Sequence, residues 1–324
     1  MCPVNAGAPG LRGAVGAHVS VQAAGRGWPN VNLQDGYEMS RDYRGDPAHI
    51  AALKSGGARP LALASADFDH DGTPDVVAAY AVGDSGMIVV QHGNPDAFAP
   101  KDDSVFERLQ QGYDPEPLLP TAEVYAVPVR PDFVVTGNFS NDASQDILLA
   151  AKGGGLYLLK GDGAGKFEAA REIPLPGKVT ALAAGEFRAA DGFADVAVGI
   201  TTAGGEALLI FDDAAQGFFD PVVALPLAAP VSAIEFGGLD DDAFMDVAVA
   251  TGSDVLVVHG WSRAEQVDPA TRVEHIAVGT AVRGLAVGQF TWDRAGRSEI
   301  AALTADGAVD DGRTALLRRP HAAE

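Results

Sequence analysis

A short acidic stretch, residues 65–76 with the sequence SADFDHDGTPDV, has the residue types and spacing of a metal-binding loop. Numbering from its first aspartate puts carboxylates at positions 1, 3, 5 and 9, which are Asp67, Asp69, Asp71 and Asp75. Gly72 at position 6 permits the sharp bend that lets alternate side chains converge. Carboxylates brought so close repel one another by roughly 1 kcal/mol or more per pair, and a bound cation removes this cost.

The predicted ligands are all oxygen atoms, which favour Ca²⁺, or Mn²⁺ and Mg²⁺, over zinc or copper. The main-chain carbonyl of Thr73, at position 7, is the expected backbone ligand. An EF-hand begins with the same spacing, but it requires a glutamate at position 12 and a helix on each side. Position 12 is Ala78, and both flanks have strand-like sequences. The loop is therefore predicted to join two β-strands and to bind Ca²⁺.

Four later stretches resemble this loop less closely. The second copy keeps oxygen-bearing side chains at all four positions, and the fourth keeps three carboxylates with Gly238 at position 1. Their predicted metal ligands are Asn138, Ser140, Asp142 and Asp146, and Asp240, Asp242 and Asp246. The third and fifth copies carry insertions, and their corresponding residues are Glu186, Asp191 and Asp195, and Gln289, Thr291, Asp293 and Glu299. Because degenerate copies more often persist as hydrogen-bonded turns, we expect about one to three bound Ca²⁺ ions.

The acidic loops belong to a repeat with a period near 50 residues. Each copy has an apolar strand, a turn with Gly or Pro, a second strand, the acidic loop, and an acidic residue followed by a strand such as VVA or VAV. The copies cover residues 49–80, 125–151, 173–200, 223–251 and 275–303. A further strand is predicted after each copy, within 86–94, 154–167, 206–219, 254–261 and 313–319.

Short strands at this period predict an all-β fold, a β-propeller of four-stranded blades with about five blades visible. A β-sandwich would not repeat at this period, and the coils of a β-helix are shorter. Residues 46–55 could form a helix, but their match to 273–279 favours a strand. The predicted organisation is an irregular N-terminal segment at 1–45, a propeller at 46–319 with an insertion loop at 99–120, and a tail at 320–324.

The sequence DFDHDGTPDVV, with LLKGDGAGKF downstream, resembles the FG-GAP/VCBS repeats of integrin-α-like β-propellers and of many large bacterial secreted proteins. The resemblance extends from residue 49 to about residue 319. It implies a seven-bladed ring, so the visible blades would belong to an incomplete one. It also implies Ca²⁺ in the blade loops, a role in adhesion or recognition, and an extracellular or cell-surface location. The implied ligands are those of the first loop and, more weakly, of the second and fourth.

The composition restricts the classes of partner. A formal net charge of −21 disfavours nucleic acid and anionic membrane surfaces, which leaves a protein or glycan ligand as the expected partner. No apolar run is long enough to insert into a membrane, and the opening residues lack the pattern of a signal peptide. The single cysteine, Cys2, excludes a disulfide within the chain.

The residues form no coherent catalytic group, so we expect a non-enzymatic recognition or scaffold module. GDSG at 83–86 lacks the partners of a serine-protease nucleophile. The seven histidines form no pair with the spacing of a metal site, and none is included among the predicted ligands. A propeller can also host an enzyme, so a carbohydrate-active lyase or hydrolase is the alternative, and a purely architectural spacer is also open.

Overall fold

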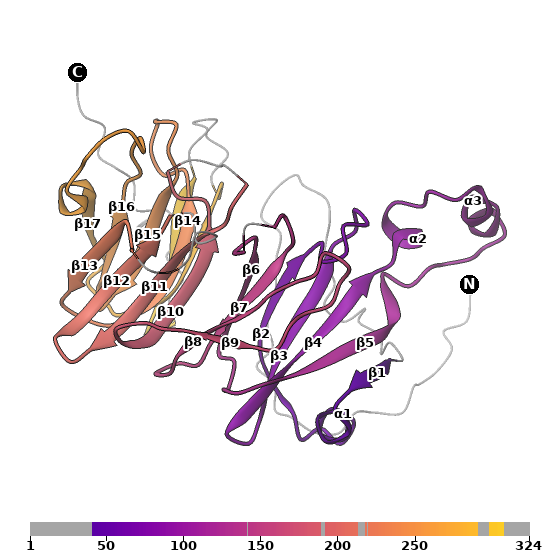
Figure 1. The fold of residues 1–324 in the computed structure, drawn as a ribbon. Helices are drawn as coiled ribbons and strands as arrows, with labels where there is room; N and C mark the ends of the chain where they lie inside the picture. The colour runs from indigo at the N-terminus through magenta and orange to yellow at the C-terminus, as the bar shows by residue number, and fades with distance from the viewer. Residues whose placement is uncertain are drawn as a thin grey trace, which may run out of the picture. The chain divides into compact units, whose positions relative to one another are not determined.

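The computed structural model describes residues 41–140, 142–188, 192–212, 218, 220–290 and 298–307. The chain divides into Met1–Ser40, which lies outside these residues, and a unit of Arg41–Glu324. Figure 1 shows that this unit is built from a succession of antiparallel sheets. The prediction of an all-β propeller of four-stranded blades is confirmed.

The first sheet has the strand order β1-β5-β4-β3-β2. Strands β2 to β5 form an antiparallel meander, and β1 joins it in parallel beside β5. The strands of this blade are β1 (Asp42–Gly45), β2 (Arg59–Ala66), β3 (Asp75–Val82), β4 (Ser85–Gly93) and β5 (Leu118–Val127). The expectation that 1–45 is irregular is therefore wrong for its last four residues, because β5 offers them an edge with unpaired backbone groups.

The next three sheets are four-stranded meanders in chain order, and the fifth has two described strands. The second blade contains β6 (Phe133–Gly137), β7 (Asp146–Ala150), β8 (Leu156–Leu159) and β9 (Arg171–Ile173). The third contains β10 (Lys178–Gly185), β11 (Asp195–Thr202), β12 (Gly205–Phe211) and β13 (Val223–Leu227). The fourth contains β14 (Val231–Gly237), β15 (Asp246–Thr251), β16 (Asp254–Val258) and β17 (Val273–Ala277). The fifth contains β18 (Val282–Gly288) and β19 (Glu299–Thr304), and the strand predicted at 313–319 lies outside the described residues.

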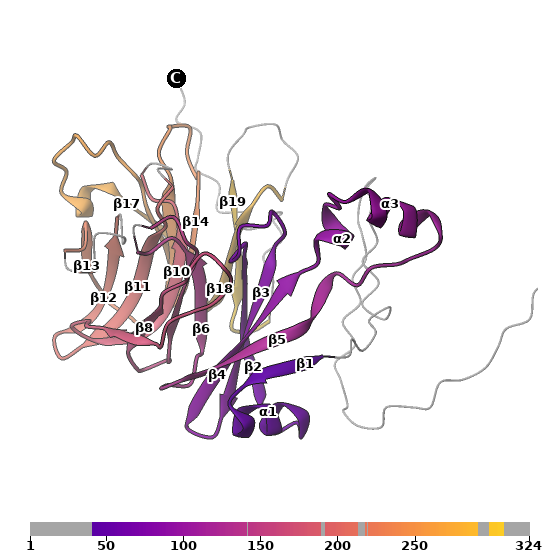
Figure 2. The same cartoon turned by 45° about the vertical axis from the view of Figure 1, so that its right-hand side comes forward.

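The first strands of successive blades lie side by side, in the order β2, β6, β10, β14 and β18 (Figures 1 and 2). Each acidic loop joins the first strand of a blade to its second, as predicted. The blades bury their faces against each other, and the cluster between the second and third blades contains Leu148, Leu158, Val198 and Leu209. A fully buried side chain of this size contributes about 1.5–3 kcal/mol, so contacts between neighbouring blades hold the unit together.

Short helices interrupt the meander, and the strand expected at 46–55 is wrong. These residues form helix α1 (Pro47–Lys54), because an Asx cap and a proline start it: Asp46 Oδ1 accepts the main-chain N–H groups of Ala48 at 2.9 Å and His49 at 3.0 Å. The stretch expected as an insertion loop at 99–120 links β4 to β5, but it contains helix α3 (Asp103–Gln110) and the start of β5. The other helices in the described part of the chain are α2 (Pro95–Phe98) and the 3₁₀ helix η2 (Pro269–Arg272).

None of the helices within the described ranges has the length and hydropathy needed to span a membrane.

Candidate metal centres in the blade loops

A buried aspartate at position 9 closes the acidic loop in each of the first four blades. In the second blade, Asp146 Oδ2 accepts the N–H of Phe139 at 2.9 Å and its Oδ1 accepts the N–H of Gly161 at 2.8 Å. These donors lie at the start of the loop and just after the third strand, so the carboxylate clamps the loop to the blade. The same pair of hydrogen bonds recurs at Asp75 and Asp246. Asp195 accepts the first bond of the pair, from the N–H at the start of its loop.

The fifth blade keeps one bond of this clamp with a longer side chain, because Glu299 Oε2 accepts the N–H of Phe290 at 2.8 Å. Position 9 was predicted to ligate metal, and the structure gives it a structural role in the loop. Both oxygens of Asp75, Asp146 and Asp246 accept a main-chain N–H. A carboxylate has about four lone-pair sites, so each oxygen can accept one more partner.

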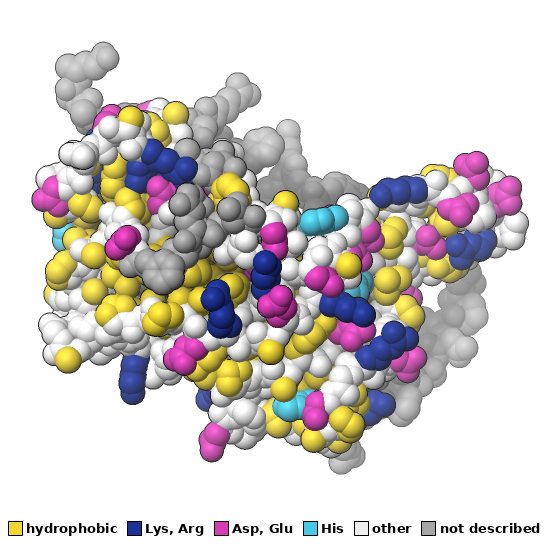
Figure 3. Space-filling view, in the orientation of Figure 1, with side chains coloured by type: hydrophobic (Ala, Val, Ile, Leu, Met, Phe, Trp, Pro, Cys, Tyr) yellow, Lys and Arg dark blue, Asp and Glu magenta, His cyan; other side chains and the backbone are white. Residues whose placement is uncertain are grey.

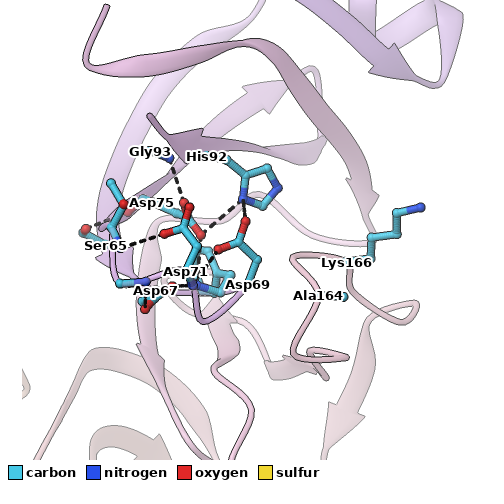
Figure 4. Close-up of polar contacts among 12 residues, drawn as sticks. Ser65, Asp67, Asp69, Asp71, Asp75, His92, Gly93, Ala164 and Lys166 are labelled. Atoms are coloured by element: carbon cyan, nitrogen blue, oxygen red, sulfur yellow. Dashed lines mark hydrogen bonds and ion pairs between the residues drawn. The ribbon is translucent and has the colours of Figure 1, made fainter. Parts of the chain in front are cut away.

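The first loop brings three of its four predicted carboxylate ligands together, as Figure 4 shows. One oxygen each of Asp67, Asp69 and Asp71 lies within 4.8 Å of the others. Backbone N–H groups of the loop hold them: Asp67 accepts from Asp71 at 3.1 Å and from Gly72 at 3.0 Å, and Asp71 accepts from Thr73 at 2.7 Å. Gly72 has φ +88°, the left-handed conformation that the predicted bend requires. Thr73 is completely buried, and its carbonyl remains a predicted ligand.

The electrostatics of the first loop reflect crowded negative charge. The pKa of Asp69 is raised, first by partial burial and then by the charges of Asp75 and Asp71. The pKa of His92 is also raised, chiefly by its hydrogen-bonding contact with Asp75, against the opposing effect of burial. His92 Nδ1 lies 3.2 Å from Asp75 Oδ2 and 3.5 Å from Asp69 Oδ2. The loop therefore favours bound positive charge.

A glycine of the second blade makes room for this histidine. The turn of GDGAGKF reaches the first loop, where the N–H of Gly165 donates to the carbonyl of Phe68 at 3.1 Å. A Cβ on Gly165 would lie 2.3 Å from His92 Cε1, and the residue has φ +79°. This turn therefore covers the acidic loop of the preceding blade.

The second loop has a permanent cation of its own. Lys160 Nζ lies 2.9 Å from Asp142 Oδ2, while Asp142 Oδ1 accepts from Ser140 Oγ and from the N–H of Ser144. Burial alone would raise the pKa of Asp142, but Lys160 and the two serine bonds together lower it. Asn138 is buried at position 1, and burial raises the pKa of Asp146. The lysine thus balances the charge of Asp142, one of the two carboxylates among the predicted ligands of this loop.

The third loop reverses this arrangement. Arg188 stands at position 3, and its Nη1 lies 3.1 Å from Oδ2 of Asp212, which follows the third strand of the blade. Its Nε donates to the carbonyl of Trp261 at 3.1 Å, and its guanidinium lies over the indole ring. Asp191 lies outside the described residues. A permanent cation therefore occupies this loop as well.

The fourth loop brings Asp240 and Asp246 together with His259. His259 Nδ1 lies 3.2 Å from Asp240 Oδ2 and 3.4 Å from Asp246 Oδ1. Asp242 lies beside them: its N–H donates to Asp240 Oδ1 at 2.9 Å, and its pKa is raised by burial and by the charge of Asp240. In the fifth loop, Thr291 and Asp293 lie outside the described residues.

Sequence reasoning missed the two histidines because it compared their spacing with other histidines and not with the acidic loops. His92 and His259 each precede a glycine at the end of the third strand, in QHG and VHG. The corresponding dipeptide in the second blade is Lys160–Gly161. The recurrence of His-Gly at one point of two repeats was the available signal.

Comparisons with known proteins give similarities to solved structures alone. No protein-family model matches the chain, and no curated protein matches it. One similar structure is described as BBS1N in complex with ARL6DN, with 15% identity, a TM-score of 0.48, and coverage of 80% of this chain and 68% of that one. Another is Sqt1 from Chaetomium thermophilum, with 15% identity, a TM-score of 0.43, and coverage of 81% and 71%. Similarity at this level carries no argument about function, which must come from the loops.

Proposed function

We propose that the chain is a non-enzymatic, calcium-binding β-propeller of the FG-GAP/VCBS type, acting as a recognition or scaffold module outside the cell or at its surface. The observation that carries the calcium proposal is the convergence of Asp67, Asp69 and Asp71. Within the described ranges, no lysine or arginine forms an ion pair with these carboxylates, and Lys101 contacts the main-chain oxygen of Asp71 instead. An external cation would supply the missing charge.

The contrast with the second and third loops supports a Ca²⁺ ion in the first loop. Lys160 and Arg188 already place permanent positive charge in the second and third loops. The first loop has four carboxylates, of which Asp69 and Asp75 contact one imidazole, and carboxylate oxygens are donors that suit Ca²⁺. Extracellular modules bind Ca²⁺ with a Kd of about 10⁻⁴–10⁻³ M, so tenfold excess calcium would stabilise the fold by about 1.4 kcal/mol.

Thermal melting of the full chain with Ca²⁺ and with EGTA tests this assignment. We expect the melting temperature to rise with calcium in the wild type and the shift to disappear in Asp71→Ala. Asp142→Ala is the matched control, because it removes the equivalent carboxylate from the loop that Lys160 neutralises. That variant should melt earlier at every calcium concentration but retain the calcium-dependent shift. An equal shift in wild type and Asp71→Ala would refute the site.

The recognition part of the proposal rests on the arm of residues 94–120, which carries α2 and α3. Phe98 and Phe106 are 54% and 46% exposed on it. Figure 3 shows hydrophobic and acidic side chains next to one another on this arm. The arm has six acidic and two basic residues, and Arg108 is engaged by Asp96 and lies over the ring of Tyr113. Exposed aromatic residues within an acidic border suit a partner with basic and apolar side chains.

A double variant, Phe98→Ser with Phe106→Ser, tests the arm because both side chains are exposed and their loss should leave the melting temperature unchanged. We expect the wild type to bind basic amphipathic peptides in a salt-dependent way and the double variant to lose this binding. Equal binding by both proteins would remove the arm from the proposal. Turnover of any substrate in a glycan panel would overturn its non-enzymatic part.

A further inference from the structure

The end of the third strand faces the acidic loop in four blades, and the charges there follow a pattern. In the second blade this place holds Lys160, which pairs with the loop. In the third blade it holds Asp212, and the loop supplies Arg188. In the first and fourth blades it holds His92 and His259. Each loop thus requires positive charge, but two blades have an imidazole in place of a permanent cation.

The fourth blade presents three donor atoms to one point. One donor atom each of His259, Asp240 and Asp246 lies within 4.8 Å of the others. The two nitrogen–oxygen distances are 3.2 and 3.4 Å. Donor atoms bonded to zinc at about 2.0–2.1 Å in a tetrahedron lie roughly 3.3 Å apart, which agrees with both distances. The side chains are 11%, 12% and 0% exposed for His259, Asp240 and Asp246, so little water competes for them.

A third carboxylate orients the imidazole. His259 Nε2 lies 3.2 Å from Glu274 Oε2, on strand β17 of the same blade. An ionised carboxylate can only accept a hydrogen bond, so Nε2 carries the hydrogen. In the neutral imidazole, Nδ1 then directs its lone pair towards Asp240 and Asp246. A histidine held between a carboxylate and a metal ion has this arrangement, because the carboxylate sets the tautomer and increases the basicity of the metal-binding nitrogen.

We propose that the fourth blade binds a divalent transition metal of the Zn²⁺ class through Asp240, Asp246 and His259, with Glu274 as the positioning residue. The nitrogen donor changes the class of metal from the Ca²⁺ predicted from oxygen ligands alone, since imidazole favours Zn²⁺ and similar ions. This site is independent of the calcium loop of the first blade. There, His92 repeats the contacts with Asp69 and Asp75, but Asp69 also belongs to the calcium loop.

Metal titration of the full chain after chelator treatment tests the proposal. The variant His259→Lys copies the residue that the second blade uses at this place, so it supplies a permanent cation and preserves the fold. We expect calorimetry with ZnCl₂ to find one fewer tightly bound equivalent in His259→Lys than in the wild type. Cobalt should give a visible absorption band in the wild type that this variant loses.

The matched control is His92→Lys, which makes the same exchange in the first blade and should retain the equivalent that belongs to the fourth. Glu274→Gln should bind Zn²⁺ about 10–100-fold more weakly, as expected for a residue that positions a metal ligand. If the wild type binds no Zn²⁺, or His259→Lys binds as many equivalents, His259 acts as a protonated counter-ion and the proposal is wrong. Calcium titration of the same samples reports separately on the first blade.

Discussion

Replacing Asp146 with alanine should destabilise the propeller strongly, because this buried carboxylate is the acceptor for two main-chain N–H groups. It is 0% exposed, and its bonds to Phe139 and Gly161 are 2.9 and 2.8 Å long. Alanine leaves both N–H groups without an acceptor, at a cost of about 1–3 kcal/mol each. Relief of the buried charge, whose desolvation raises the pKa of Asp146, offsets part of this loss. We therefore expect a net loss of about 2–4 kcal/mol.

Asp162, in the hairpin that follows β8, provides a matched control for the same substitution. Its Oδ1 also accepts two main-chain N–H groups, from Ala164 at 2.8 Å and Lys166 at 3.0 Å, but the residue is exposed. In Asp162→Ala, water takes over the two donors, and the cost should stay below about 1 kcal/mol. The two variants differ chiefly in burial, so their comparison isolates the cost of leaving buried N–H groups unpaired.

Urea unfolding of the wild type and both variants, at constant calcium concentration and neutral pH, measures these values from the shift of the midpoint and the slope. Equal destabilisation by the two substitutions would refute the assignment of Asp146 as a clamp between the loop and the third strand. A loss in Asp146→Ala that is seen with calcium and disappears in EGTA would instead support its predicted role as a metal ligand.

Three other predictions concern local features of the blades. Burial raises the pKa of Asp146, so its carboxyl group binds a proton more tightly in the folded state than in the unfolded chain. Urea titrations should therefore show the stability of the wild type rising relative to Asp146→Asn as the pH falls from neutral into the acid range. Gly165→Ala should lower the stability by about 1–3 kcal/mol in thermal melts, because the added Cβ clashes with His92. Gly153→Ala is the control: this residue has φ +73° but open space around its Cβ, so the substitution should cost about 1 kcal/mol. Asp46→Ala should remove the cap of α1 and cost about 1 kcal/mol in the same assay.

The period of the acidic loops was enough to predict the blades, because each blade repeats the same alternation of buried strands and polar turns. The helix at 47–54 can also be predicted from its Asp-Pro start, a local signal that outweighs the match to 273–279. The convergence of Asp67, Asp69 and Asp71 followed from their alternate spacing around Gly72.

The clamp could not be predicted in the same way, since an aspartate at position 9 looks the same whether it binds metal or backbone. Its second donor lies 15 residues downstream in the case of Gly161 and 18 residues in the case of Gly93. These separations depend on the lengths of the strands and turns between, which sequence spacing does not determine. For the same reason, the contacts of His92 and His259 with their loops could not be predicted from sequence spacing.

The two roles within each loop explain why the copies can lose carboxylates and still fold. The clamp at position 9 ties loop to blade through neutral N–H donors, so it needs no ion and is present whether position 3 is Asp69, Ser140 or Arg188. The side chains at positions 1 to 5 determine how much negative charge the loop carries. Lys160 balances this charge in the second blade, and in the third blade Arg188 pairs with Asp212. Removing a metal ion from one loop should therefore increase repulsion in that blade alone, and leave the contacts that bury one blade against the next in place.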